Sequence, residues 1–231
     1  MTQRNWHSGS WEKAFPGRRD PRKVVQFMHA QWRYLLIHKP DAIDPTKNTE
    51  PTITEFFCEF LKNTSVEGGL TGYFYYETKH ANIEPGATVL SKRIRTDIQY
   101  QFPVRNSPDI VHLVFEFKKL KNTKPSRKLY YGDQGMLRFI SGYYASRWAY
   151  GFMVGLLDHD GVDAIKQLKV AIQSPAIASH PLCLKSDING NLISDPSLNM
   201  PNLAHFDTTH SRSVYGPHSD LMLCHFFLEA P

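Results

Sequence analysis

The sequence predicts an α/β protein in which helices flank a central mixed β-sheet. Apolar and polar residues alternate in segments 93–102 and 111–118, which indicates two strands that each bury one face on a core. The apolar segment 150–157 is typical of a fully buried strand. Helical spacing of apolar residues follows Asp20-Pro21, so helices accompany the strands. Elements of both kinds along one chain favour a layered α/β architecture.

The first elements are predicted from their end signals. Asp20 can act as an N-cap ahead of Pro21 at the first helical position, so a helix is expected there, ending before Pro40. Thr52-Ile-Thr-Glu55 has the pattern of a capping box, which predicts a second helix over residues 52–61. Gly68-Gly69 then interrupts the chain ahead of a strand expected at residues 70–77.

The loop between the two alternating strands is rich in Pro, Asn and Ser, which is typical of a hairpin connection. Residues 174–204 are predicted to be irregular, with a turn at Asn189-Gly190. The other expected elements are a helix beginning near Asp133, the buried strand 150–157, a helix over 162–172 and a last strand over 221–229.

The length of 231 residues suits one large domain, or one domain with a small appendage. We assign residues 1–49 to an N-terminal arm and helix and residues 50–231 to the main domain, and expect one compact unit. The longest apolar run, 150–157, is too short to cross a bilayer, and the first twenty residues lack a secretory signal pattern. Three widely spaced cysteines indicate neither a disulfide framework nor a metal knuckle. A soluble, cytoplasmic protein is expected.

The net charge of +5 gives modest support for a polyanionic partner. Six of the eleven residues from Lys118 to Lys128 are Lys or Arg, and none is acidic. A solvated loop explains this run equally well when it is taken alone. The candidate nucleic-acid contacts are Lys119, Lys121, Lys124, Arg127, Lys128, Arg93 and Arg95.

The two alternating strands place three charged residues on one face if they form a hairpin. Opposed residues of an antiparallel pair keep a constant index sum, so Phe102 opposite Val111 puts Asp97 opposite Glu116. The two carboxylates would then have Cβ atoms ~5 Å apart. Lys118 would lie on the same face, about 7 Å further along its strand.

Two carboxylates that close repel each other unless a cation neutralises them, and Mg²⁺ prefers oxygen ligands. Mg²⁺ is therefore the expected cofactor, with Mn²⁺ as a substitute, and the carbonyl of Phe117 could add another ligand. Such an ion would polarise a phosphate and lower the pKa of a water. Lys118 could orient that water or stabilise charge on phosphorus.

The order of Asp97 on one strand and Glu116-Phe117-Lys118 at the end of the next resembles the PD-(D/E)XK nuclease superfamily, over roughly residues 50–172. The resemblance implies a restriction-endonuclease-like core and metal-dependent cleavage. It also implies roles for two further residues. Glu55 resembles the helical acid that often assists the metal, and Gln134 is similar to the polar residue that many members carry on the helix after the lysine strand.

The motif departs from the family pattern in two ways. Thr96, not Pro, precedes Asp97, and a literal Pro108-Asp109 competes for the role. Asp109 is seven residues before Glu116, about 23 Å away in one extended strand. One metal ion cannot bridge that distance, so we keep Asp97.

We therefore predict a Mg²⁺-dependent nuclease, with DNA the favoured substrate and a role in restriction, phage defence or repair. A homodimer or a partner subunit is expected, because one site cuts one strand. The first alternative is a catalytically silent nucleic-acid-binding or scaffold subunit, and a second is an interaction subunit that contacts partners through its aromatic residues. Glu116 and Lys118 could also be no more than a surface ion pair on the exposed face of an antiparallel strand.

Other chemistries find less support in the sequence. No GxSxG, GxxxxGK[ST] or GxGxxG motif occurs, which disfavours serine hydrolases and nucleotide-fuelled enzymes. The segment 205–213 could contact phosphate through His210 and Arg212, or could form an edge strand or turn. The C-terminal cluster of possible zinc ligands has no established spacing: His205, His210, His218, Cys224 and His225.

Overall fold

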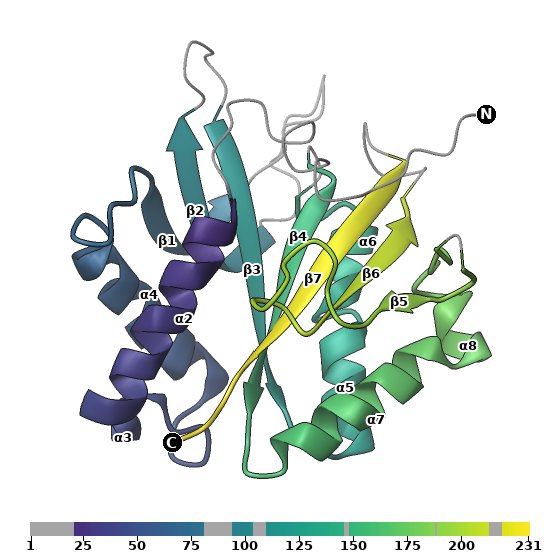
Figure 1. The fold of residues 1–231 in the computed structure, drawn as a ribbon, viewed down its shortest axis with the longest axis horizontal. Helices are drawn as coiled ribbons and strands as arrows, with labels where there is room; N and C mark the ends of the chain where they lie inside the picture. Colours follow the sequence, from purple (N-terminus) through teal and green to yellow (C-terminus); the bar gives the residue numbers. More distant parts are fainter. Residues whose placement is uncertain (1–20, 81–93, 104–109, 146–147, 188, 213–218) are drawn as a thin grey trace, which may run out of the picture.

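The computed structural model describes residues 21–80, 94–103, 110–145, 148–187, 189–212 and 219–231. Seven strands form one sheet in the order β1-β2-β3-β4-β7-β6-β5, with helices on both faces (Figure 1). The predicted α/β class is confirmed. Within the described ranges, no helix is both long and apolar enough to span a bilayer. The strands are β1 (Tyr73–His80), β2 (Ile94–Pro103), β3 (Ile110–Leu120), β4 (Tyr150–Leu157), β5 (Ile193–Ser194), β6 (Phe206–Ser211) and β7 (Asp220–Leu228).

The sheet is mixed, as predicted. β1, β2 and β3 form an antiparallel meander, β3, β4 and β7 are parallel, and β7, β6 and β5 are again antiparallel. Phe102 lies opposite Val111, which confirms the predicted hairpin register. The pairing of β2 with β3 continues to Ile98 opposite Phe115, so Asp97 and Glu116 stand just beyond the last pair.

β3 is buried on both faces, so the prediction that its polar face meets solvent is wrong. Its odd-numbered residues, including Phe115 and Phe117, pack with α2 and α4 in one core cluster. Its even-numbered residues, including Val114, pack in a second cluster with the helices that cover the other face. Crossovers between parallel strands place helices on the sheet, and they cover Glu116 completely. The helices are α2 (Pro21–His38), α3 (Pro40–Ile43), α4 (Glu50–Thr64), α5 (Lys124–Tyr131), α6 (Met136–Ile140), α7 (Gly161–Gln173) and α8 (Pro175–Ala178).

Helix α4 begins one turn earlier than its sequence pattern suggests. Thr49 is its N-cap, and the Thr49 hydroxyl accepts the backbone N–H of Thr52 at 3.4 Å. The capping box predicted at Thr52 is therefore wrong, because Pro51 suits the first turn and the helix already includes it. Glu50 stands at the helix start, and Glu55 is exposed in the second turn.

Of the helix predicted from Asp133, only the short α6 forms, and a helix that was not predicted, α5, precedes it across a short turn. Lys124-Pro125 starts α5 within the basic run, again with Pro in the first turn. At Gly135 a Cβ atom would lie 1.9 Å from the carbonyl oxygen of Tyr130, so only glycine lets the chain turn there. Gln134 lies in this turn and is exposed.

Candidate active site

The site forms where β2 diverges from β3. Past the last β2–β3 pair, the backbone N–H of Phe117 donates to Oδ2 of Asp97 at 2.8 Å. The next N–H on the same edge, that of Lys119, donates to Oε2 of Glu50 at 2.9 Å. Along this stretch of β3, two carboxylates thus accept the backbone N–H groups that a neighbouring strand would otherwise accept. The N–H and C=O of one strand residue point the same way, so the carbonyl of Phe117 faces these carboxylates too.

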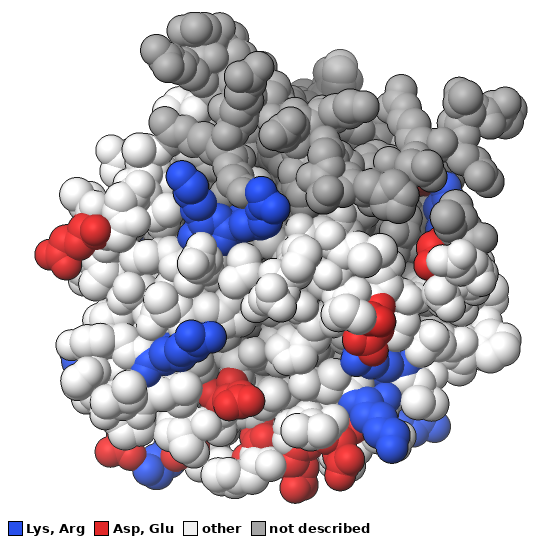
Figure 2. Space-filling model, in the orientation of Figure 1, with Lys and Arg blue, Asp and Glu red and all other residues white. Residues whose placement is uncertain are grey.

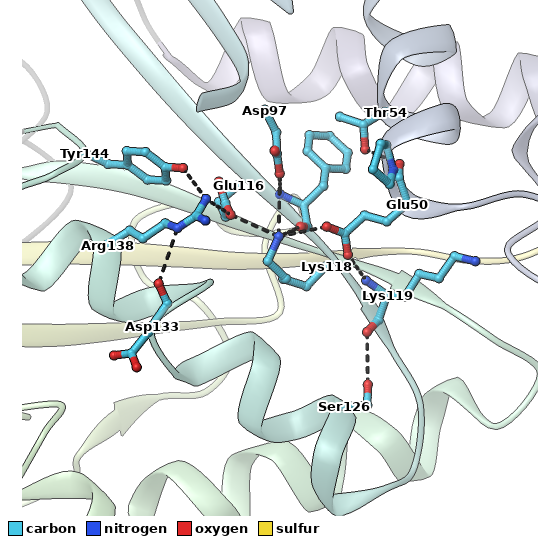
Figure 3. A network of polar contacts seen from close by, with 12 residues as sticks. Glu50, Thr54, Asp97, Glu116, Lys118, Lys119, Ser126, Asp133, Arg138 and Tyr144 are labelled. Atoms are coloured by element: carbon cyan, nitrogen blue, oxygen red, sulfur yellow. Dashed lines mark hydrogen bonds and ion pairs between the residues drawn. The ribbon is translucent and has the colours of Figure 1, made fainter. Parts of the chain in front are cut away.

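The ammonium group of Lys118 lies at the centre of these groups (Figure 3). Its Nζ is 2.8 Å from Oε1 of Glu50, 3.0 Å from Oε1 of Glu116 and 3.8 Å from Oδ2 of Asp97. It also donates to the carbonyl oxygen of Phe117. We call these four oxygen atoms, from Glu50, Asp97, Glu116 and Phe117, the oxygen cage.

Glu116 is the most deeply buried carboxylate of the oxygen cage, with 0% of its side chain exposed. Both Lys118 and Arg138 contact its Oε1, with Nζ of Lys118 at 3.0 Å and Nη1 of Arg138 at 3.1 Å. Its Oε2 is buried and has no hydrogen-bond partner among the described residues. A buried acceptor without a partner costs about 1–3 kcal/mol, more when it is charged, so this oxygen is suited to an added ligand.

Burial and mutual repulsion dominate the electrostatics. Burial, followed by the negative charge of Asp97, raises the pKa of Glu116 to about 8. Burial also raises the pKa of Asp97, although Lys118 opposes it. Burial alone would lower the pKa of Lys118, but the three surrounding carboxylates outweigh it and raise that pKa. Lys118 is therefore positively charged in this site.

Arg138 of α6 extends the site on the side away from Glu50. Its Nη1 donates to the Tyr144 hydroxyl at 2.5 Å, its Nε donates to the carbonyl of Asp133 at 3.3 Å, and its guanidinium stacks on the Tyr144 ring at 5.4 Å. These contacts fix a side chain that is 34% exposed. A guanidinium held in this way can bind a phosphate oxygen with its free edge.

The structure brings together four of the predicted residues, Asp97, Glu116, Phe117 and Lys118, but neither Glu55 nor Gln134. Glu55 is five residues beyond Glu50, about 140° around the helix, and it is exposed. Glu50 and Arg138 hold the places expected of these two residues. Glu50 stands beside a helix-starting Pro51, which was a usable signal, whereas nothing in the sequence singled out Arg138 or Tyr144.

Of the seven candidate nucleic-acid contacts, Lys124 and Lys128 are exposed on α5. Lys119 instead has a structural role, because its Nζ donates to the carbonyl of Pro45 at 2.5 Å and to that of Asn48. Lys121 pairs with Asp158 at 3.4 Å, and Arg127 donates to Asn122 at 3.2 Å. Arg93 and the side chain of Arg95 lie outside the described residues.

The face shown in Figure 2, which carries α2, presents acidic and basic side chains interspersed along its lower edge. The described part of that face therefore offers no continuous basic surface. The exposed lysines of α5 instead follow directly after the lysine strand, close in sequence to the oxygen cage.

A divalent metal fits the chemistry of the donor set, although the donors are not arranged around a metal here. Across the described ranges, no group of three or more His, Cys, Asp and Glu side chains is positioned to hold a metal ion. The three carboxylates of the cage instead surround an ammonium nitrogen at 2.8–3.8 Å, beyond the 2.0–2.1 Å that Mg²⁺ needs. The buried, unpartnered Oε2 of Glu116 supports the fit. Asp97, Glu116 and the carbonyl of Phe117 would hold the ion.

The C-terminal histidines do not form a metal cluster among the described residues. His210 and His225 lie in β6 and β7, where the hydroxyl of Thr208 joins their Nε2 atoms at 2.7 and 2.8 Å. Nδ1 of His210 meets the carbonyl of Leu182 at 2.7 Å, and Nδ1 of His225 meets the hydroxyl of Tyr130 at 3.0 Å. Both rings are completely buried. His218 lies outside the described residues.

Comparison with protein-family models, with curated proteins and with solved structures finds no match for this chain. Function is therefore inferred from the geometry and electrostatics of the oxygen cage. Groups from α4, β2 and β3 converge there on one buried point, which the packing of the sheet alone does not require.

Proposed function

We propose that this chain is a Mg²⁺-dependent nuclease that hydrolyses phosphodiester bonds. The observation that carries the proposal is the buried Glu116, whose Oε2 has no partner in the described part of the chain while Asp97 and Lys118 converge on the same point. A surface ion pair, the simplest alternative for Glu116 and Lys118, would be solvent-exposed, whereas these side chains are 0% and 8% exposed. The likeness of this motif to the PD-(D/E)XK superfamily supports the same function and a restriction-endonuclease-like core.

Each residue of the site has a proposed role. Asp97, Glu116 and the Phe117 carbonyl hold the ion, with Glu50 as an additional carboxylate. A bound Mg²⁺ would supply Lewis-acid polarisation of the phosphate and would acidify a nearby water. Lys118 orients that water or stabilises the charge that develops on phosphorus. Arg138, held by Tyr144, binds a non-bridging phosphate oxygen.

The net charge of the site residues favours an anionic substrate only when a metal ion is bound. With all groups ionised, three carboxylates and two cations give the site a charge of −1, which repels a phosphodiester. A divalent ion changes the sign, so the loaded site attracts the substrate. We propose DNA as the substrate, endonuclease action in restriction, phage defence or repair, and a homodimer or a partner subunit that supplies the second cut.

The proposal is tested by cleavage of supercoiled plasmid, linear duplex, single-stranded DNA and RNA, each with Mg²⁺, Mn²⁺ or EDTA. We expect metal-dependent cleavage by the wild type. Glu116→Gln and Lys118→Met should each lower the rate by at least about 100-fold, since each removes a group that acts in the reaction.

Helix α4 provides a matched control. Glu50→Gln and Glu55→Gln make the same chemical change five residues apart, but only Glu50 contacts Lys118. We expect a loss of rate for Glu50→Gln alone. Cleavage that survives in both Glu116→Gln and Lys118→Met would contradict the nuclease proposal. Metal-independent, salt-sensitive nucleic-acid binding without any cleavage would favour the silent scaffold instead.

A further inference from the structure

Lys118 lies inside the oxygen cage rather than beside it. An ammonium group has three N–H donors, and three cage acceptors lie within hydrogen-bonding reach: Oε1 of Glu50, Oε1 of Glu116 and the carbonyl of Phe117. The fourth oxygen, Oδ2 of Asp97, completes the surroundings at 3.8 Å. In this arrangement no ammonium donor is left for a water or a substrate phosphate.

A divalent ion held by the Glu116 carboxylate and the carbonyl of Phe117 would use groups that already hold this ammonium group. Metal–oxygen distances are near 2 Å, so an ion on the carbonyl of Phe117 would stand within about 5 Å of the present Nζ position, whichever oxygen of Glu116 it binds. Two positive charges at that separation repel strongly in a buried site. The ammonium group and the metal therefore exclude each other.

We propose that Lys118 is the resident cation of this site, and that a divalent ion binds only by displacing its ammonium group from the oxygen cage. This inference rests on the proposed function, which supplies the metal, and adds that the ammonium group must leave the oxygen cage for the metal to bind. Displacement frees all three N–H donors of Lys118 at the moment when the ion is in place. The lysine is thereby held away from its water or phosphate until the metal has bound.

Arg138 differs from Lys118 in one respect that makes a test possible. Both cations approach the same oxygen of Glu116, at 3.1 and 3.0 Å. Arg138 contacts no other cage oxygen in the described contacts, and Tyr144 and the Asp133 carbonyl hold it outside. Removing either cation changes the charge near Glu116 equally, but only removing Lys118 empties the cage.

The first experiment is calorimetric titration of Mn²⁺ into wild type, Lys118→Met, Arg138→Met and Glu116→Gln, without nucleic acid. We expect Lys118→Met to bind Mn²⁺ at least about tenfold more tightly than wild type. We expect Arg138→Met to gain about threefold or less, and Glu116→Gln to lose binding. Equal gains for Lys118→Met and Arg138→Met, or no gain for Lys118→Met, would overturn the displacement while leaving the metal site intact.

A second measurement uses the wild type alone, in case Lys118→Met does not fold. Reductive methylation, read by mass spectrometry of peptides, reports how accessible each lysine amine is with and without Mn²⁺. We expect Lys118 to become several-fold more reactive when Mn²⁺ binds, while Lys119 and Lys62 stay constant as internal references. Unchanged or lower reactivity of Lys118 at saturating Mn²⁺ overturns the inference. An absence of Mn²⁺ binding in wild type and Lys118→Met overturns the proposed metal site as well.

Discussion

At the scale of single residues, Glu116 combines complete burial with a proposed function that needs its charge. Burial, followed by the charge of Asp97, raises the pKa of Glu116 to about 8. A carboxyl group with a raised pKa stabilises the fold below its unfolded pKa of 4.5, and this contribution is lost as the pH rises toward 8. The protein therefore becomes less stable across the pH range in which Glu116 gains the charge that the proposed metal site needs.

Replacing Glu116 with Gln is expected to remove this instability. The free energy of unfolding of Glu116→Gln relative to wild type should increase between pH 5 and pH 8, by at most about 1.4 kcal/mol per pH unit. Urea unfolding in EDTA at several pH values measures the difference. Glu55→Gln, an exposed carboxylate on α4, serves as the reference. Parallel stability curves for wild type and Glu116→Gln would contradict the raised pKa.

Part of the site could be predicted residue by residue, for a physical reason. A constant index sum across a hairpin relates Asp97 to Glu116, and a period of two places Lys118 on the same face. Glu50 was not predicted as a site residue, because it contacts Lys118 across 68 sequence positions, from a helix to a strand. No local pattern encodes such a contact. The sequence predicts an acidic residue on α4 at the site, but it points to Glu55, whereas Glu50, in the preceding turn, makes the contact.

At the scale of elements, a buried chain of polar groups joins α5, β7, β6 and the segment before β5. Burial lowers the pKa of His210 to about 4 and that of His225 well below its ordinary value, so both rings are neutral. Nδ1–H of His210 must then donate to the carbonyl of Leu182, which leaves its Nε2 to accept from Thr208. Thr208 accepts Nε2–H of His225 in turn, and Tyr130 donates to Nδ1 of His225.

Because Thr208 joins both histidines, Thr208→Val should destabilise the protein by about 3 kcal/mol. Valine has a similar shape but leaves two buried ring nitrogens without partners, at roughly 1–3 kcal/mol each. Thr209→Val, on the opposite face of β6, should cost less than about 1 kcal/mol. Urea unfolding of both variants measures the contrast. Similar losses for the two variants would show that the chain of polar groups does not contribute.

The same polar groups explain why β6 was hard to predict as a strand. Asp207, Thr208 and His210 are more typical of a loop, and the sequence left an edge strand and a turn equally open. The structure buries all three and gives each a partner. Burial of polar residues is decided by the groups that they meet across the fold, and local sequence does not contain that information.

At the scale of the whole molecule, strand periodicity predicts the fold class, but it does not predict that the site is buried. Alternation in 93–102 and 111–118 predicts the hairpin, and the apolar segment 150–157 predicts a buried strand. The two core clusters on opposite faces of β3 depend on where the helices pack. The same packing turns an apparent surface pair, Glu116 and Lys118, into a buried site.

The distribution of charge over the molecule makes a final prediction about nucleic-acid binding. The chain has a net charge of +5, and Lys128→Glu and Lys166→Glu each reduce it to +3. Both lysines are exposed, but Lys128 belongs to α5 and Lys166 to α7. If α5 contacts the phosphate backbone, Lys128→Glu alone should weaken binding, and it should reduce the slope of log affinity against log salt by about one.

The measurement is a salt titration of binding by fluorescence anisotropy in EDTA, with Glu116→Gln as the parent so that no cleavage occurs. Net charge alone acts over a distance that salt screens, about 8–10 Å near physiological ionic strength. A purely global effect would therefore weaken both variants equally. Equal losses for Lys128→Glu and Lys166→Glu would remove α5 as the contact element. A loss confined to Lys128→Glu would place the nucleic-acid backbone along α5, the helix that directly follows β3.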